Sequence, residues 1–118
     1  MIFTTTRVRF PSGSDVLVGD LHQPQGQDTE SATTIVIVTG SWTTVKEQQA
    51  DFYARRLAAA GLNTLVFDFR GFGQSEGNPR CWENPARKVE DIRAAVSFAA
   101  SQGYTRIGAL GICASAGY

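Results

Sequence analysis

Residues Thr33 to Thr39, with the sequence TTIVIVT, form the stretch that decides the fold of this chain. Its apolar residues are continuous rather than alternating with polar ones, which is typical of a strand covered on both faces in a parallel sheet. A strand of this kind needs helices on both sides. The run therefore predicts an α/β fold.

Helical periodicity follows this strand. Apolar residues recur at helical spacing between Lys46 and Ala60, and Gly61 stands where a helix stop is expected. Leu62 to Phe69 is then predicted as a second buried strand. The helix is expected to turn these residues inward: Ala50, Tyr53, Ala54, Leu57 and Ala58.

A second helix and a further strand follow a glycine-rich loop, Arg70 to Gly77. The helix is predicted over Pro85 to Gln102, and the strand over Thr105 to Leu110. We expect Val89, Ile92, Val96 and Ala99 on the inner face of the helix, with Arg87, Lys88, Glu90 and Arg93 directed away from it.

The amino-terminal residues predict a β-hairpin ahead of these units. Ile2 to Phe10 and Asp15 to Leu21 flank a short turn, and Gln23 to Ser31 is polar enough for a surface loop. The expected fold is therefore a mainly parallel sheet of about five strands with an antiparallel amino-terminal hairpin and two helices.

Composition excludes several classes of function. The 118 residues suffice for one domain or a part of one, and eleven basic residues balance eleven acidic ones, so nucleic acid is not expected as a partner. The longest aliphatic run, Ile35 to Val38, is too short to span a membrane. One histidine and two distant cysteines offer no metal cluster. We expect a cytoplasmic protein with no cofactor, no metal and no membrane partner.

A cluster of small residues ends the chain. A nucleophile at a sharp turn from strand to helix needs small neighbours two positions away on each side. Gly111-Ile112-Cys113-Ala114-Ser115 meets that need with Cys113 at the apex, and a frame shifted by two residues would place Ser115 there. The apolar run ends at Leu110, which favours Cys113. The alternative is that Cys113 is simply a small buried apolar residue.

These segments resemble the α/β-hydrolase superfamily, and the resemblance covers the whole chain. Asp68 to Gly77 matches that family's D-x-R-G-x-G-x-S-x-G segment, and Val38 to Trp42 resembles its loop after the third strand. Gly111 to Tyr118 is similar to the nucleophile elbow of members like dienelactone hydrolases and thioester-cleaving hydrolases, in which cysteine replaces serine. Ser115 stands where the strict pattern has glycine.

The resemblance implies that residues 1–118 are the amino-terminal part of one α/β-hydrolase domain, with sheet order 1-2-4-3-5 for its first strands. The activity implied is hydrolysis of small carboxylic esters or thioesters through a Cys113 or Ser115 acyl-enzyme. The site residues that it implies are the Ala114 and Ser41 N–H groups as oxyanion donors, Trp42 beside them at the pocket, and Asp68, Arg70, Gly71 and Gly73 as structural supports.

The superfamily order of nucleophile, acid and then histidine leaves the acid and the base outside this sequence. His22 precedes the nucleophile, and we expect it to be a surface histidine without a catalytic role. The alternative function is a non-catalytic fragment or binding module. Because the last predicted strand has an apolar edge, such a chain is expected to self-associate or to bind a complementing carboxy-terminal segment.

Overall fold

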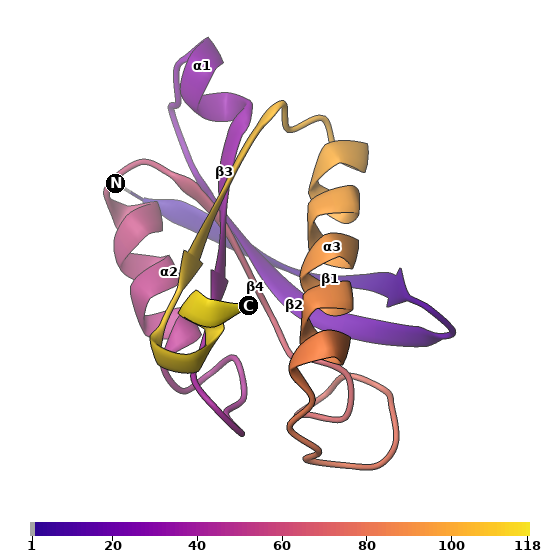
Figure 1. The fold of residues 1–118 in the computed structure, drawn as a ribbon. Helices are drawn as coiled ribbons and strands as arrows, with labels where there is room; N and C mark the ends of the chain where they lie inside the picture. Colours follow the sequence, from indigo (N-terminus) through magenta and orange to yellow (C-terminus); the bar gives the residue numbers. More distant parts are fainter. Residues whose placement is uncertain (1) are drawn as a thin grey trace.

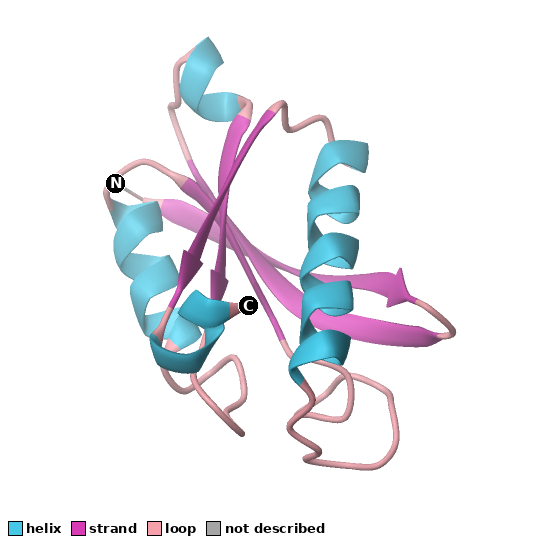
Figure 2. Cartoon of the chain, viewed as in Figure 1, coloured by secondary structure: helices cyan, strands magenta, loops and turns pink. Residues whose placement is uncertain are grey.

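The computed structural model describes residues 2–118, which form one mixed sheet with helices on both faces (Figures 1 and 2). Three α-helices lie among the described residues, and a 3-10 turn follows the last strand. The elements are β1 (Phe3–Ser12), β2 (Asp15–Pro24), α1 (Thr29–Ala32), β3 (Thr34–Thr39), α2 (Ala50–Ala59), β4 (Asn63–Phe67), α3 (Pro85–Ser101), β5 (Arg106–Gly111) and the 3-10 turn η1 (Cys113–Gly117).

The strand order is β1-β2-β4-β3-β5. β1 pairs antiparallel with β2, and β2 pairs antiparallel with β4. β3 pairs parallel with β4 on one side and with β5 on the other. The predicted fold class is therefore confirmed: an antiparallel hairpin leads into a parallel unit, in the order that the resemblance implied.

The β3 run is covered on both faces. Ile35 and Ile37 belong to a core cluster that includes Ala95 and Ala99 of α3. Val38 belongs to a second cluster, which α2 covers from the other face. Figure 1 shows α2 and α3 on opposite sides of the sheet. Successive residues of the run thus face different helices, which explains why the sequence lacks alternation.

The predicted helix over Lys46 to Ala60 is too long at its start, because α2 begins at Ala50. Lys46 instead lies in a turn, where its backbone N–H donates to Asp68 Oδ1 at 2.8 Å. Tyr53 is also wrongly placed, since it is 45% exposed. The small side chains of this helix, rather than its aromatic ones, pack on the sheet: Ala50, Ala54 and Ala58.

The inner face of α3 differs from the predicted one. Val96 is exposed, whereas Lys88, expected to point away, is 2% exposed. Lys88 is buried because its ammonium meets the Glu83 carboxylate and the rings of Phe69 and Phe72. The loop predicted over Gln23 to Ser31 also contains the start of α1, a helix of four residues that the Asp28 side chain caps.

The outer side of β5 carries no strand partner among residues 2–118. Most of β5 is exposed, and Leu110 is 36% exposed. Within residues 2–118, no helix has the length and apolar character to cross a bilayer.

Candidate active site

Three segments meet at the edge of the sheet where the parallel strands end. They are the β3–α2 loop (residues 40–49), the β4–α3 loop (residues 68–84) and the elbow segment (residues 112–118). All three lie at the lower end of the molecule in Figure 1. Ligands of open α/β sheets collect at this edge, so it is the first place to look for a site.

Cys113 is the first residue of η1 and follows Ile112, which comes directly after β5. Its φ is +57°, a left-handed conformation that costs a non-glycine residue free energy, and its side chain is exposed. Gly111 makes this bend possible. A Cβ on Gly111 would lie 2.6 Å from the backbone oxygen of Ser115 and 2.7 Å from the nitrogen of Ala116. A left-handed residue that follows a strand and a glycine without room for a side chain is what the predicted elbow with Cys113 at its apex requires.

Ser115, the other candidate nucleophile, is buried, with 6% of its surface exposed. Its Oγ donates to the backbone oxygen of Gly40 and also lies 3.2 Å from the oxygen of Ile112. The hydroxyl that departs from the strict family pattern therefore ties the elbow segment to the β3–α2 loop. Ser115 is therefore buried and bonded, whereas Cys113 is exposed.

The β3–α2 loop turns back on itself directly beside the elbow segment. Thr44 Oγ1 donates to the oxygen of Ser41 at 2.8 Å, and Thr43 adopts a φ of +50°. Trp42 is 66% exposed. Within residues 2–118, the backbone N–H groups of Ser41, Trp42 and Ala114 donate no hydrogen bond.

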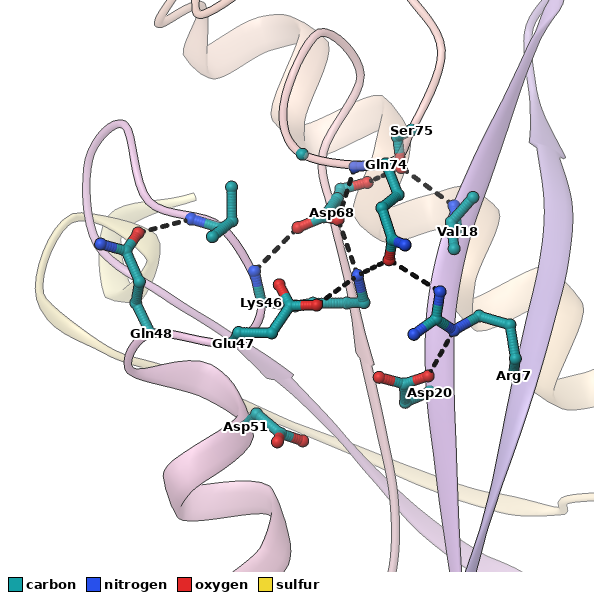
Figure 3. A network of polar contacts seen from close by, with 12 residues as sticks. Arg7, Val18, Asp20, Lys46, Glu47, Gln48, Asp51, Asp68, Gln74 and Ser75 are labelled. Atoms are coloured by element: carbon teal, nitrogen blue, oxygen red, sulfur yellow. Dashed lines mark hydrogen bonds and ion pairs between the residues drawn. The ribbon is translucent and has the colours of Figure 1, made fainter.

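The β4–α3 loop is built around the buried carboxylate of Asp68 (Figure 3). Its Oδ2 accepts from Lys46 Nζ at 2.9 Å and from the N–H of Gln74 at 3.0 Å. Burial alone would lower the pKa of Lys46, but hydrogen bonds from its ammonium to Asp68 and Glu47 outweigh burial and raise that pKa. Asp68 thus joins two loops of the site through a charged, buried pair.

Two glycines of this loop lie where a side chain would collide with packed neighbouring atoms. A Cβ on Gly73 would lie 2.3 Å from Asp68 Oδ2, and one on Gly71 would lie 2.8 Å from the oxygen of Pro79. Ser75 bridges Asp68 to the hairpin, because its Oγ bonds the oxygen of Asp68 and accepts from the N–H of Val18. The D-x-R-G-x-G-x-S pattern therefore describes one folded loop.

Arg70 braces the loop separately from Asp68. Its Nε donates to Asp91 Oδ1 at 2.7 Å, and its backbone N–H donates to Asp91 Oδ2 at 2.8 Å. The guanidinium also reaches the exposed carboxylate of Glu90. Burial would lower the pKa of Arg70, yet its bond to Glu90 and the charge of Asp91 raise it. The bracing contacts expected of Asp68 and Arg70 exist, with partners that the sequence did not indicate.

His22 is not the surface residue that the sequence predicted, because its side chain is fully buried. Its Nε2 lies 2.7 Å from Asp51 Oδ1, and its Nδ1 lies 2.8 Å from Thr5 Oγ1. β2 is three strand spacings from β5, about 14 Å across the sheet. His22 therefore links the hairpin to α2 and lies too far away to act as the base of Cys113.

Sequence reasoning missed Lys46, Glu83 and Tyr118. Glu83 accepts from the N–H of Thr43 at 3.1 Å, from Lys88 Nζ at 2.7 Å and from the Tyr118 hydroxyl. Neither residue type nor spacing signals this convergence, since the donors come from three separate segments. The sequence contained one weak indication for Lys46: it is a charged residue at the start of a predicted helix, one turn before the inward Ala50.

Comparison with known proteins places this chain among hydrolases. The sequence profile of the family described as serine aminopeptidase, S33, matches residues 29–117. The crystal structure of the hypothetical protein PA2218 from Pseudomonas aeruginosa superposes with a TM-score of 0.83 at 34% identity, over 94% of this chain and 36% of that one. In sequence, PA2218 is 38% identical over 100 residues, which are 82% of this chain and 27% of PA2218.

Two other relatives extend the comparison. The uncharacterized protein YcjY of Escherichia coli is 48% identical over 77 residues, 63% of this chain and 25% of YcjY. The thiohydrolase aneE of Aspergillus aculeatus is 33% identical over 67 residues, 57% of this chain and 21% of aneE. The chain spans about a quarter of the length of PA2218 and YcjY.

Proposed function

Because the chain belongs to the serine aminopeptidase S33 family of α/β hydrolases, we propose that it carries the nucleophile and oxyanion hole of an ester or thioester hydrolase. One observation carries the proposal: the exposed Cys113 stands at a strained elbow, beside backbone N–H groups that have no partner within residues 2–118. The acid and base are assigned to residues outside this chain, because His22 lies too far from Cys113.

The proposed chemistry is acyl transfer to a thiol. Cys113 Sγ forms a bond to the acyl carbonyl carbon, and the π-electron pair of the carbonyl moves onto oxygen. The N–H groups of Ala114 and Ser41 bind this oxyanion, and the N–H of Trp42, the next residue, is the alternative donor to that of Ser41. The pair then returns, the bond to the leaving group breaks, and the alcohol or thiol departs with a proton. Water adds to the thioester and releases the carboxylic acid, which restores the thiol.

Thioesters are included among the substrates for two reasons. The elbow resembles those of thioester-cleaving and dienelactone hydrolases with a cysteine nucleophile, and aneE, a relative in sequence, is named a thiohydrolase. The exposed indole of Trp42 beside the elbow offers an apolar surface to an acyl group. We therefore propose a small acyl ester or thioester with an apolar acyl part.

Acylation of the chain by p-nitrophenyl acetate tests this proposal. In a chain with Cys81→Ser, which removes the other exposed thiol, we expect about one equivalent of nitrophenolate without sustained turnover, because the base is assigned to residues outside this chain. Intact mass should show one acetyl group, on Cys113. Cys113→Ala should abolish the adduct, and Ser115→Ala should retain it. An adduct that survives Cys113→Ala and disappears with Ser115→Ala would reverse the assignment of the nucleophile, and no adduct at either residue would contradict the function.

The exposed side of β5 supports the second candidate, a non-catalytic module that associates with another chain. An apolar cavity of about 210 Å³ lies next to β5 between α3 and the elbow segment. Exposed strand edges recruit further strands. We propose that the chain self-associates there, or binds a complementing carboxy-terminal segment.

Light scattering tests this association. The chain should have more than the monomer mass, and Leu110→Lys on β5 should restore the monomer. Val96→Lys, at a similarly exposed position on α3, is the matched control and should change nothing. A monomer mass for the unsubstituted chain would contradict self-association.

A further inference from the structure

We propose that Glu83 is a positioning residue that holds the β3–α2 loop in its reactive shape through the N–H of Thr43. The inference rests on the proposed function, because it assigns a role to Ser41 and Trp42 as donors. Glu83 belongs to the β4–α3 loop and contributes no group to the reacting atoms. Its role would be to fix the residue directly after the candidate oxyanion donors.

Thr43 needs such a support. Its φ of +50° is a strained conformation for a residue with a branched side chain, and it persists only where the surroundings fix it. The Thr43 hydroxyl contacts its own neighbour, the oxygen of Trp42, at 2.8 Å. The bond that reaches outside the β3–α2 loop is the one from its N–H to Glu83 Oε1, at 3.1 Å.

Glu83 is itself held from two further directions. Lys88 Nζ of α3 lies 2.7 Å from Oε1, and the Tyr118 hydroxyl of the elbow segment donates to Oε2. The Lys88 ammonium lies 4.6 Å from the ring centroids of Phe69 and Phe72, and the residue is buried. The carboxylate is therefore a fixed point joining all three segments of the site.

The charges of this cluster keep the carboxylate ionised. Burial would raise the pKa of Glu83, but the bonds from Lys88, Tyr118 and the Thr43 N–H outweigh it and lower that pKa. Burial and the neighbouring Glu83 raise the pKa of Tyr118 well above its usual value, so its hydroxyl remains a donor. An ionised acceptor makes the bond to Thr43 stronger than a neutral pair would.

The experiment compares two reactions of Cys113 in the full chain with Cys81→Ser, because Cys81 is a second exposed thiol. Acylation by p-nitrophenyl acetate develops an oxyanion, whereas alkylation by iodoacetamide does not. Glu83→Ala should slow acylation about 10- to 100-fold by loosening the loop, and should leave alkylation unchanged. Glu83→Gln keeps an acceptor for the Thr43 N–H and should retain most of the acylation rate. Glu76→Ala is the matched control, since Glu76 accepts the N–H of Val16 instead.

Amide exchange of Thr43, followed by NMR, provides a readout that needs no reaction. Glu83→Ala should speed exchange of this N–H about tenfold or more, while Glu76→Ala should not. Glu83→Ala leaves Lys88 without its ion-pair partner, which could unfold the variant. In that case the double variant Glu83→Ala, Lys88→Met, which removes both charges, is measured instead of the single variant.

Three outcomes would overturn the positioning role: unchanged Thr43 exchange, equal slowing of acylation and alkylation, or Glu83→Gln as slow as Glu83→Ala. If the unsubstituted chain is not acylated at Cys113, the proposed function fails, and Thr43 exchange alone still decides whether Glu83 holds the loop.

Discussion

Two segments that follow parallel strands at the same sheet edge handle their polar groups in opposite ways. The β4–α3 loop buries the carboxylate of Asp68 and satisfies it with Lys46 and backbone N–H groups. The elbow segment instead presents Cys113 to solvent at a strained φ. The contrast is between a loop whose buried carboxylate is fully hydrogen-bonded and a neighbouring segment whose candidate nucleophile is exposed.

The two segments also differ in how specific their sequence motifs are and in whether their side chains are available for a reaction. Asp68 to Gly77 is the most family-specific stretch of the sequence, yet its side chains bond within the fold: Asp68 to Lys46, Arg70 to Asp91 and Ser75 to β2. The elbow is a weaker pattern of small residues. A specific motif can therefore identify a fold while the reacting group lies elsewhere.

The largest expected effect concerns the buried pair. Asp68→Ala leaves the Lys46 ammonium buried without its main partner, so the free energy of unfolding should fall by about 3–5 kcal/mol. Glu90→Ala removes a carboxylate that is 64% exposed from its pair with Arg70, and should cost less than about 1 kcal/mol. Denaturant titrations of both variants measure the difference. Equal losses would mean that the buried loop is no more constrained than the surface beside it.

The strands could be predicted from the sequence because burial on two faces leaves a continuous apolar run, as in Ile35 to Val38. Their order followed from the family resemblance instead. The elbow at Cys113 stays a prediction, which rests on the small residues around Cys113 as a local steric requirement. What failed depended on tertiary partners. The inward Lys88, the start of α2 after Lys46 and the buried His22 each depend on a hydrogen-bond partner outside the element that was predicted. Neither hydrophobic periodicity nor residue spacing records such a pairing.

A smaller effect is expected at the elbow, where the constraint is space rather than charge. Gly111→Ala would push a methyl group against the backbone of Ser115 and Ala116, so the free energy of unfolding should fall by about 1–3 kcal/mol. The bend at Cys113 should open, and acylation by p-nitrophenyl acetate should fall further than the unfolded fraction explains.

Gly108→Ala is the control for this substitution, because Gly108 lies on the same strand and a Cβ there meets no atom within 4 Å. It should leave both stability and acylation unchanged, or raise stability slightly, since alanine loses less backbone entropy in a strand. If the two variants behave alike, the small residues beside Cys113 do not shape the elbow, and the contrast between a constrained loop and a strained one fails. If Gly111→Ala alone loses acylation while Asp68→Ala loses mainly stability, support and reactivity are assigned to separate segments of one edge.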